Sequence, residues 1–214
     1  MDSLKRNDLL KDWLSRKLKI DFSISSASSD ASFRRYFRVK TVKDTFIVMD
    51  APPENESIEA FVKIGQILST INVNVPDIFE EDNALGFILM QDFGSDTYLD
   101  VLNDDNQQRL YSDSIESLIQ MQKLVKKDLC QSYTQKILFD EMSLFIEWYL
   151  KKYKKIELTN KENEKLLSCF ETISKKALSQ EKFFVHRDYH SRNLMNKKLN
   201  NPGILDFQDA LVGP

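Results

Sequence analysis

The segment that most constrains the fold reads His186-Arg187-Asp188-Tyr189-His190-Ser191-Arg192-Asn193, and Asp206 follows it after a short interval. The apolar residues Phe183–Val185 before the segment predict one short strand, and Ile204-Leu205 before Asp206 predicts another. Two strands that flank one polar loop bring the side chains at their ends together. We therefore expect the acidic and amide side chains of the loop to lie near Asp206.

This combination of residue types suits phosphoryl transfer, which depends on positioning, on a divalent metal that neutralises phosphate charge, and on a carboxylate that orients the acceptor hydroxyl. Asp188 lies where a carboxylate can accept a hydroxyl proton, while Asn193 and Asp206 offer the oxygen ligands that Mg²⁺ accepts. Either aspartate alone is more typical of a turn. Together, the order His-x-Asp-x-x-x-x-Asn, then a strand, then Asp predicts a kinase-type catalytic centre.

The remaining sequence predicts two lobes. Helical spacing of apolar residues marks 7–19 and 56–68, and strand-like composition marks 33–40, 45–49, 78–80 and 87–90, of which the first two form a hairpin. Beyond residue 97 the spacing is mainly helical, over 98–102, 107–125, 138–152 and 163–178. We expect an α+β bilobal fold, with a nucleotide-binding N-lobe over residues 1–92 and a mainly helical C-lobe over residues 93–214.

Composition excludes several functions. The net charge of −3 and pI near 5.6 give no electrostatic basis for nucleic-acid binding. No apolar run is long enough to span a bilayer, and the N-terminus lacks the apolar core of a signal peptide. Cys130 and Cys169 belong to no metal or redox pattern. We expect a cytoplasmic monomer that acts on a small molecule.

His186–Asn193 together with Asp206-Phe207-Gln208-Asp209 resembles the catalytic and metal-binding loops of the aminoglycoside phosphotransferase family, which has a protein-kinase-like fold. The resemblance implies ATP and Mg²⁺ as cofactors, Asp188 as the catalytic base and His186 as a brace of the catalytic loop. It implies Asn193 and Asp206 as the metal ligands.

The resemblance also assigns nucleotide-binding residues. Ser29, Asp30, Ala31 and Ser32 would replace the phosphate-covering loop, and residues near Met90 and Asp92 would form the hinge that contacts adenine. The chain departs from the family pattern here, because residues 22–40 contain no glycine and Met49 stands where a phosphate-binding lysine is expected.

A nearby arginine is expected to replace that lysine. Arg34, Arg35 and Arg38 are the candidates, and we count Arg35 among the nucleotide-binding residues. Strand alternation would place Arg34 and Arg38 on one face and Arg35 on the other. Glu56 or Glu59 would pair with whichever arginine serves, and the sequence leaves both choices open.

Four segments narrow the resemblance further, to the anomeric N-acetylmuramate/N-acetylglucosamine kinases within that family: Asp30–Arg38, Met49–Pro53, Leu144–Tyr149 and His186–Met195. This implies an amino-sugar acceptor. The alternatives are an aminoglycoside, choline or homoserine kinase, or an inactive kinase-like protein with a scaffold role. Residues 97–214 show no excess of acids, which disfavours a polycationic acceptor. The family's helical lobe continues past the equivalent of Pro214, so we interpret the chain as C-terminally truncated.

Overall fold

The structure is a computed structural model that describes residues 3–27 and 34–214. By its internal contacts the chain divides into two compact units. The first comprises Met1–Gln120 with Asp188–Asp209, and the second comprises Met121–Arg187 with Ala210–Pro214. Each unit combines helices with antiparallel strands, as the sequence predicts for an α+β protein.

A five-stranded antiparallel sheet forms the centre of the first unit. It has the order β1-β2-β3-β5-β4. Its strands are β1 (Ser23–Ser26), β2 (Arg35–Lys40), β3 (Thr45–Asp50), β4 (Ile78–Asp82) and β5 (Phe87–Gln91). The expected β2–β3 hairpin is confirmed, and its turn is closed by the Thr41 N–H, which donates to Asp44 O over 2.9 Å.

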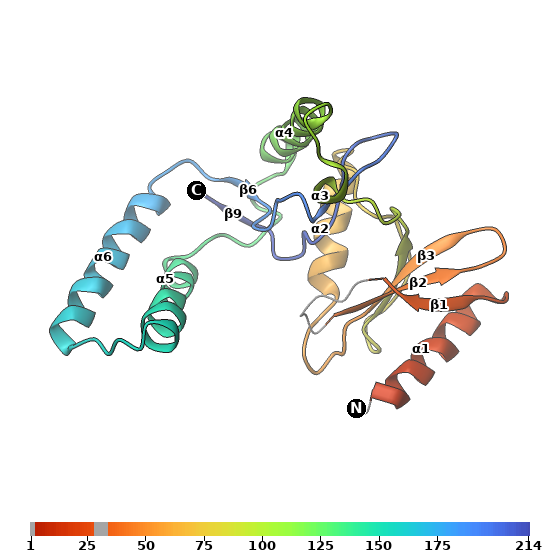
Figure 1. Ribbon diagram of the computed structural model, residues 1–214, viewed down its shortest axis with the longest axis horizontal. Helices are drawn as coiled ribbons and strands as arrows, with labels where there is room; N and C mark the ends of the chain where they lie inside the picture. The colour runs from red at the N-terminus through yellow and green to blue at the C-terminus, as the bar shows by residue number, and fades with distance from the viewer. Residues whose placement is uncertain (1–2, 28–33) are drawn as a thin grey trace. The chain divides into compact units, whose positions relative to one another are not determined.

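Helix α1 (Ser3–Leu18) covers one face of this sheet (Figure 1). Leu10, Trp13 and Leu14 are almost fully buried there. They pack with the side chains of alternate strand residues, namely Val39, Val48, Phe87 and Leu89. Because successive strand residues point to opposite faces, this set defines the α1 side of the sheet.

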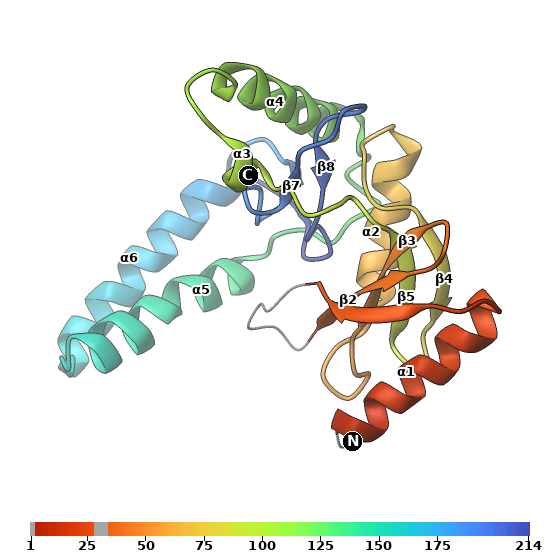
Figure 2. The same ribbon diagram turned by 45° about the vertical axis from the view of Figure 1, so that its right-hand side comes forward.

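Helix α2 (Glu59–Thr70) covers the opposite face (Figure 2). Its buried residues Phe61, Ile64, Gly65 and Leu68 repeat every three or four positions, as an amphipathic helix requires. The ring of Phe207 packs 4.7 Å from that of Phe61, between centroids, and touches Gly65. Residues next to Phe207 are therefore fixed against α2.

The first unit also contains the short helix α3 (Tyr98–Val101) and the two-stranded pair β7 (Leu194–Met195) and β8 (Gly203–Ile204). Thr97 caps α3 and forms an isolated bridge with Met195. Helix α4 (Gln107–Leu124) follows α3 in the chain. These contacts connect the β7–β8 pair to the segment that follows the sheet.

The second unit consists of α5 (Gln135–Leu144), the π-helix η1 (Phe145–Tyr153), α6 (Asn160–Leu178), and the paired strands β6 (Phe183–Val185) and β9 (Leu211–Gly213). Thr134 and Thr159 cap α5 and α6. The helices meet where Phe139 and Phe170 pack edge to face, 6.0 Å apart between ring centroids. Among the described residues, the helices are all too short or too polar to cross a membrane.

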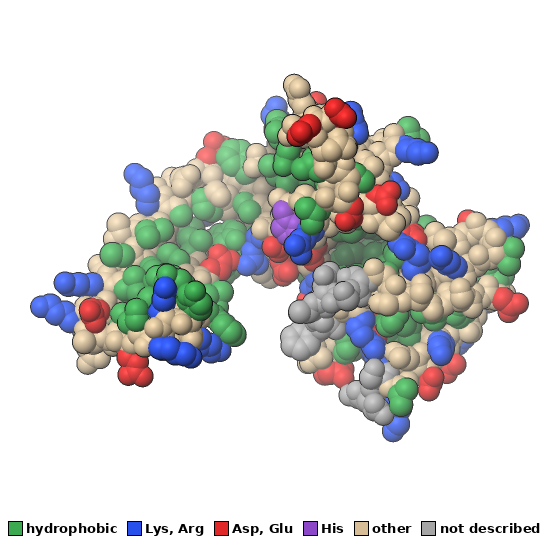
Figure 3. Space-filling view, in the orientation of Figure 1, with side chains coloured by type: hydrophobic (Ala, Val, Ile, Leu, Met, Phe, Trp, Pro, Cys, Tyr) green, Lys and Arg blue, Asp and Glu red, His purple; other side chains and the backbone are tan. Residues whose placement is uncertain are grey.

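The sequence predicts a single helix over 138–152, but the structure changes from α to π geometry at Phe145. The Lys154 N–H donates to Tyr149 O, five residues back, over 2.9 Å. In this wider turn the rings of Phe145 and Tyr149 stack, with centroids 5.2 Å apart. Hydrophobic side chains gather on the surface of this region (Figure 3), and Phe145, Trp148, Tyr149 and Tyr153 are exposed there.

Candidate active site

Asn193 and Asp206 lie side by side because β7 and β8 pair. Leu194 is opposite Ile204, and the Leu205 N–H donates to Asn193 O over 2.9 Å. The side-chain nitrogen of Asn193 is 3.3 Å from Asp206 Oδ2 and donates to the backbone oxygen of Asp188 over 3.0 Å. The backbone of Asp188 and the side chains of Asn193 and Asp206 thus lie together in the first unit.

The loop that carries Asp188 is held by its own backbone. The His190 N–H donates to Asp188 O over 3.1 Å, and the Asn193 N–H donates to His190 O over 2.9 Å. The Tyr189 hydroxyl donates to Ser114 O over 2.6 Å, and burial raises the pKa of that hydroxyl. Asp188 is itself exposed. The Asp188 carboxylate is therefore accessible, on a loop that the backbone hydrogen bonds and the Tyr189 hydroxyl hold in place.

Asp206 occupies a sharp bend in the chain. Its φ of 60° is in the left-handed region, which aspartate adopts more readily than most residues. The bend sends Phe207 into the core and brings Gln208 back, so that Gln208 Nε2 donates to Asp206 Oδ1 over 2.7 Å. Asp206 is thus positioned by the residues that follow it.

The donor set around Asp206 fits a hard divalent cation. Asp206 offers a carboxylate, and the amide nitrogens of Asn193 and Gln208 face its two oxygens. Each of these amides also carries an oxygen of the kind that Mg²⁺ accepts as a ligand. Gln208 Oε1 is buried and has no hydrogen-bond partner among the described residues. No cluster of three His, Cys, Asp or Glu residues with metal-site geometry occurs in residues 3–27 and 34–214. Mg²⁺ needs none, since it is commonly held by one or two side chains together with phosphates and water.

Arg34 lies beside this group. Its guanidinium forms an ion pair with Glu56, and its Nη1 is 3.7 Å from Asp206 Oδ1. The Arg34 side chain is only 9% exposed. The neighbouring Tyr36 is partly buried. This burial, opposed by Arg34 and reinforced by the charge of Asp206, raises its pKa to about 12. Tyr36 is therefore neutral near pH 7, and the charges in this cluster come from Arg34 and the carboxylates.

The other two arginines have different partners. Arg35 forms an ion pair with Asp50, whose fully buried carboxylate also accepts from Arg6 Nε over 2.8 Å. Arg38 donates to both carboxylate oxygens of Asp92, at 2.7 and 3.1 Å. These ion pairs are not predicted from the sequence, because they depend on which strand residues face each other in the folded sheet.

The remaining predicted site residues are either in contacts other than those with Asn193 and Asp206 or outside the described residues. Met90 is buried in β5, where it is paired with Ile47 on one side and Ile78 on the other. His186 is buried directly after β6 in the second unit. Ser29, Asp30, Ala31 and Ser32 lie outside the described residues. Nucleotide binding by Met90, Asp92 and Arg35 and the bracing role of His186 stay predictions.

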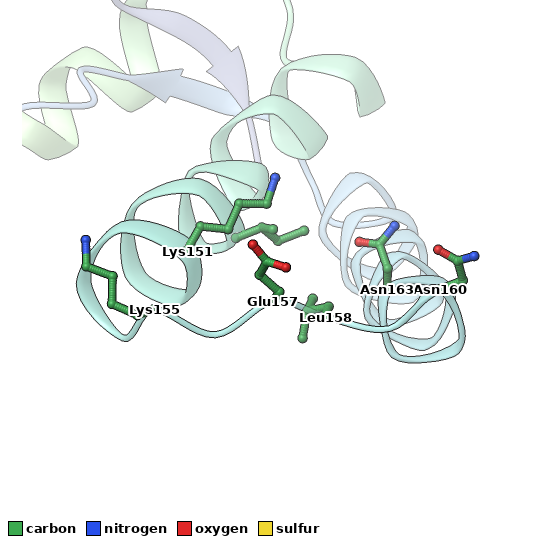
Figure 4. A pocket seen from close by; sticks show the side chains of 7 residues that line it. Lys151, Lys155, Glu157, Leu158, Asn160 and Asn163 are labelled. Carbon is green, nitrogen blue, oxygen red and sulfur yellow. The ribbon is translucent and has the colours of Figure 1, made fainter.

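A hollow of about 610 Å³ lies in the second unit. Its lining side chains come from η1, from α6 and from the turn between them (Figure 4); they are Ile146, Lys151, Lys155, Glu157, Leu158, Asn160 and Asn163. None of the candidate catalytic or metal-binding residues is among them. The hollow belongs to the second unit, and the Asp188 loop belongs to the first.

A family model described as the phosphotransferase enzyme family matches residues 23–214. The chain belongs to this family. The N-acetylmuramate/N-acetylglucosamine kinase of Pseudomonas putida is 42% identical over 192 residues, which are 90% of this chain and 56% of that protein. The kinase of the same name from Pseudomonas aeruginosa is 43% identical, over 88% of this chain and 55% of its own length. The chain thus spans about half the length of these relatives.

Solved structures of the family's fold confirm the expected kinase-like architecture. Choline kinase from Streptococcus pneumoniae superposes with a TM-score of 0.67 at 13% identity, over 97% of this chain and 70% of that chain. The ternary complex of streptomycin, ATP and the aminoglycoside phosphotransferase APH(2")-IIa gives a TM-score of 0.65 at 17% identity, over 100% and 72%. At these identities the likeness establishes the fold alone.

Proposed function

We propose that this chain carries the phosphotransfer site of an ATP-dependent kinase that phosphorylates the anomeric hydroxyl of N-acetylmuramate or N-acetylglucosamine. The observation that carries the proposal is the meeting of Asn193 and Asp206 beside the Asp188 loop. The names of the relatives that are 42% and 43% identical support an amino-sugar acceptor. Because ATP is the phosphoryl donor, we expect the protein to work in the cytoplasm. We also expect it to act as a monomer.

In the proposed reaction, Mg²⁺ held by Asn193 and Asp206 would neutralise charge on the phosphates. Asn193 would use its amide oxygen as the ligand, the atom type that Mg²⁺ accepts; in the structure its amide nitrogen donates to Asp188 O and faces Asp206 Oδ2. Asp188 accepts the proton of the acceptor hydroxyl while that oxygen bonds to the γ-phosphorus. The bond from this phosphorus to the bridging oxygen of ADP breaks, ADP leaves, and the exposed Asp188 returns its proton to water.

The test is ADP release by purified protein with Mg²⁺ and ATP in the presence of N-acetylmuramate or N-acetylglucosamine. Asp188→Asn removes the proton acceptor and is expected to lower the rate by about 100-fold or more. Asp104→Asn, at an exposed aspartate of the same unit, is the matched control and should keep the wild-type rate. An unchanged rate in Asp188→Asn would remove Asp188 as the base.

The same assay separates the acceptors. Choline, homoserine and an aminoglycoside are run in parallel with the two amino sugars. Faster ADP release with any of these would replace the amino-sugar assignment. Mg²⁺-dependent ADP binding without turnover on any acceptor would instead favour a kinase-like binding protein.

A further inference from the structure

The chain lacks a lysine at the place where a kinase fold is expected to carry its phosphate-binding cation. Met49 stands there, in β3, where it is fully buried and paired with Tyr36 and Ile88. A thioether cannot compensate phosphate charge. If the chain binds a nucleotide, another residue must provide the positive charge close to the metal-binding carboxylate.

Three arginines from the start of the hairpin are candidates, and their contacts separate them. The guanidinium of Arg35 is paired with the fully buried Asp50. That of Arg38 is paired with Asp92 and also donates to Gly94 O over 2.8 Å. Both arginines therefore neutralise carboxylates of the sheet region: Asp50 is the last residue of β3, and Asp92 directly follows β5.

Arg34 differs because its charge is directed to the candidate metal site. One terminal nitrogen is paired with Glu56, and the other is 3.7 Å from Asp206 Oδ1. A separation of 3.7 Å is too long for a hydrogen bond, so this second contact is electrostatic. A phosphate on the same cation as Asp206 would lie within a few ångströms of the guanidinium, whose planar fork suits phosphate oxygens.

We propose that Arg34, held in place by Glu56, is the cation that contacts the nucleotide phosphates next to Asp206. The inference rests on the proposed function, because it requires that the site bind a nucleotide. Glu56 acts as a positioning residue: it precedes α2, and its ion pair fixes the Arg34 side chain, which is 9% exposed. The proposal selects Arg34 from Arg34, Arg35 and Arg38, and Glu56 from Glu56 and Glu59, two choices that the sequence leaves open.

The experiment is calorimetric titration of the protein with ADP, AMP and adenosine in the presence of Mg²⁺. Arg34→Met is expected to weaken ADP binding by about tenfold or more, because a charge-assisted contact to phosphate is lost. The loss should be smaller for AMP and absent for adenosine, which has no phosphate. Arg34→Lys keeps the charge and should recover part of the affinity. Arg16→Met, at an exposed arginine of α1, is the control and should bind ADP like wild type.

Glu56→Gln tests the positioning role. It should weaken ADP binding less than Arg34→Met does. The double variant should bind ADP with the same affinity as Arg34→Met alone, because both changes act through the same guanidinium. Circular dichroism verifies that each variant is folded. If Arg34→Met does not fold, the Arg34→Lys and Glu56→Gln affinities decide, since wild-type ADP affinity in both would overturn the proposal.

The outcomes distinguish this inference from the function on which it rests. Wild-type protein that binds no ADP contradicts both. Wild-type protein that binds ADP, together with a folded Arg34→Met variant of equal affinity, contradicts only the role of Arg34. A loss of adenosine affinity equal to the loss of ADP affinity would also overturn it, because that pattern indicates general damage to the site.

Discussion

The side-chain nitrogen of Asn193 lies 3.3 Å from Asp206 Oδ2, although the two residues are separated by a strand, a turn and a second strand. The pairing of β7 with β8 produces this proximity. A shared cation would convert the contact into a pair of ligands on one ion. The relationship therefore predicts that nucleotide binding depends on Mg²⁺ through both residues.

Asp206→Asn and Asn193→Ala are each expected to remove most of the increase in ADP affinity that Mg²⁺ produces in the wild-type protein. Losing one ligand is expected to weaken the contribution of the ion by about tenfold or more. Titrations with ADP in Mg²⁺ and in excess chelator measure this directly. Asp104→Asn and Asn160→Ala are matched exposed controls. An undiminished Mg²⁺ effect in both site variants would contradict the assignment.

Breaking the buried ion pairs of Asp50 is expected to destabilise the first unit strongly. Asp50 is fully buried between Arg6 and Arg35, and the Arg6 side chain is 6% exposed. Asp50→Ala leaves a buried guanidinium without its counter-charge, so we expect a loss of about 3–5 kcal/mol in the free energy of unfolding. Urea denaturation in a Trp148→Phe background measures it, because Trp13 is then the sole tryptophan and lies in the core of this unit.

A surface pair supplies the control for Asp50. Lys17 and Glu80 form an ion pair of 2.6 Å with exposed side chains. Lys17→Met should cost about 1 kcal/mol or less, because solvent screens exposed charges. If Asp50→Ala were no more destabilising than Lys17→Met, the buried pair would have little energetic importance.

Asp92 should make the first unit sensitive to acid. Burial alone would raise the pKa of this carboxyl, but hydrogen bonds from Arg38 and the Gly94 N–H, with the charge of Arg38, outweigh burial and lower the pKa. A folded-state pKa below the unfolded value of about 3.9 means that charged Asp92 stabilises the fold above that pH and that the contribution is lost as pH falls through the folded pKa.

The measurement is the urea midpoint of wild type and Asp92→Asn at about pH 6 and about pH 3. On acidification, the urea midpoint of the wild-type protein should fall further than that of Asp92→Asn. Asp128→Asn, at an exposed aspartate, should behave like wild type. Equal losses in wild type and Asp92→Asn would show that the Arg38 pair does not contribute to the acid response.

Local and long-range features differ in how well the sequence predicts them. The meeting of Asn193 and Asp206 was predictable, because a strand, a loop and a second strand within one short segment determine it. The Arg34–Glu56 pair was not, since several arginines and two glutamates satisfy the pattern and only tertiary packing selects among them. Strand β1 (Ser23–Ser26) is not predicted from the sequence. It pairs with β2, and Ile24 packs against the core on the α1 side.

Phe207 is expected to link the core to the metal site. It is fully buried, packs on Phe61 and Gly65 of α2, and directly follows Asp206. Phe207→Ala opens a cavity and should cost about 3–5 kcal/mol of stability. It also frees the bend at Asp206, so we expect weaker binding of ADP with Mg²⁺ under conditions where the variant is still folded by near-ultraviolet circular dichroism.

Leu14→Ala is the matched control, because Leu14 is equally buried but packs on the α1 side of the sheet. It should lower stability by about 2–5 kcal/mol and leave the ADP affinity of the folded protein unchanged. Calorimetric titration below the unfolding temperature of both variants separates the two effects. Equal ADP affinities for the folded Phe207→Ala and Leu14→Ala variants would contradict the link, because Asp206 would then hold its position without the buried ring that follows it.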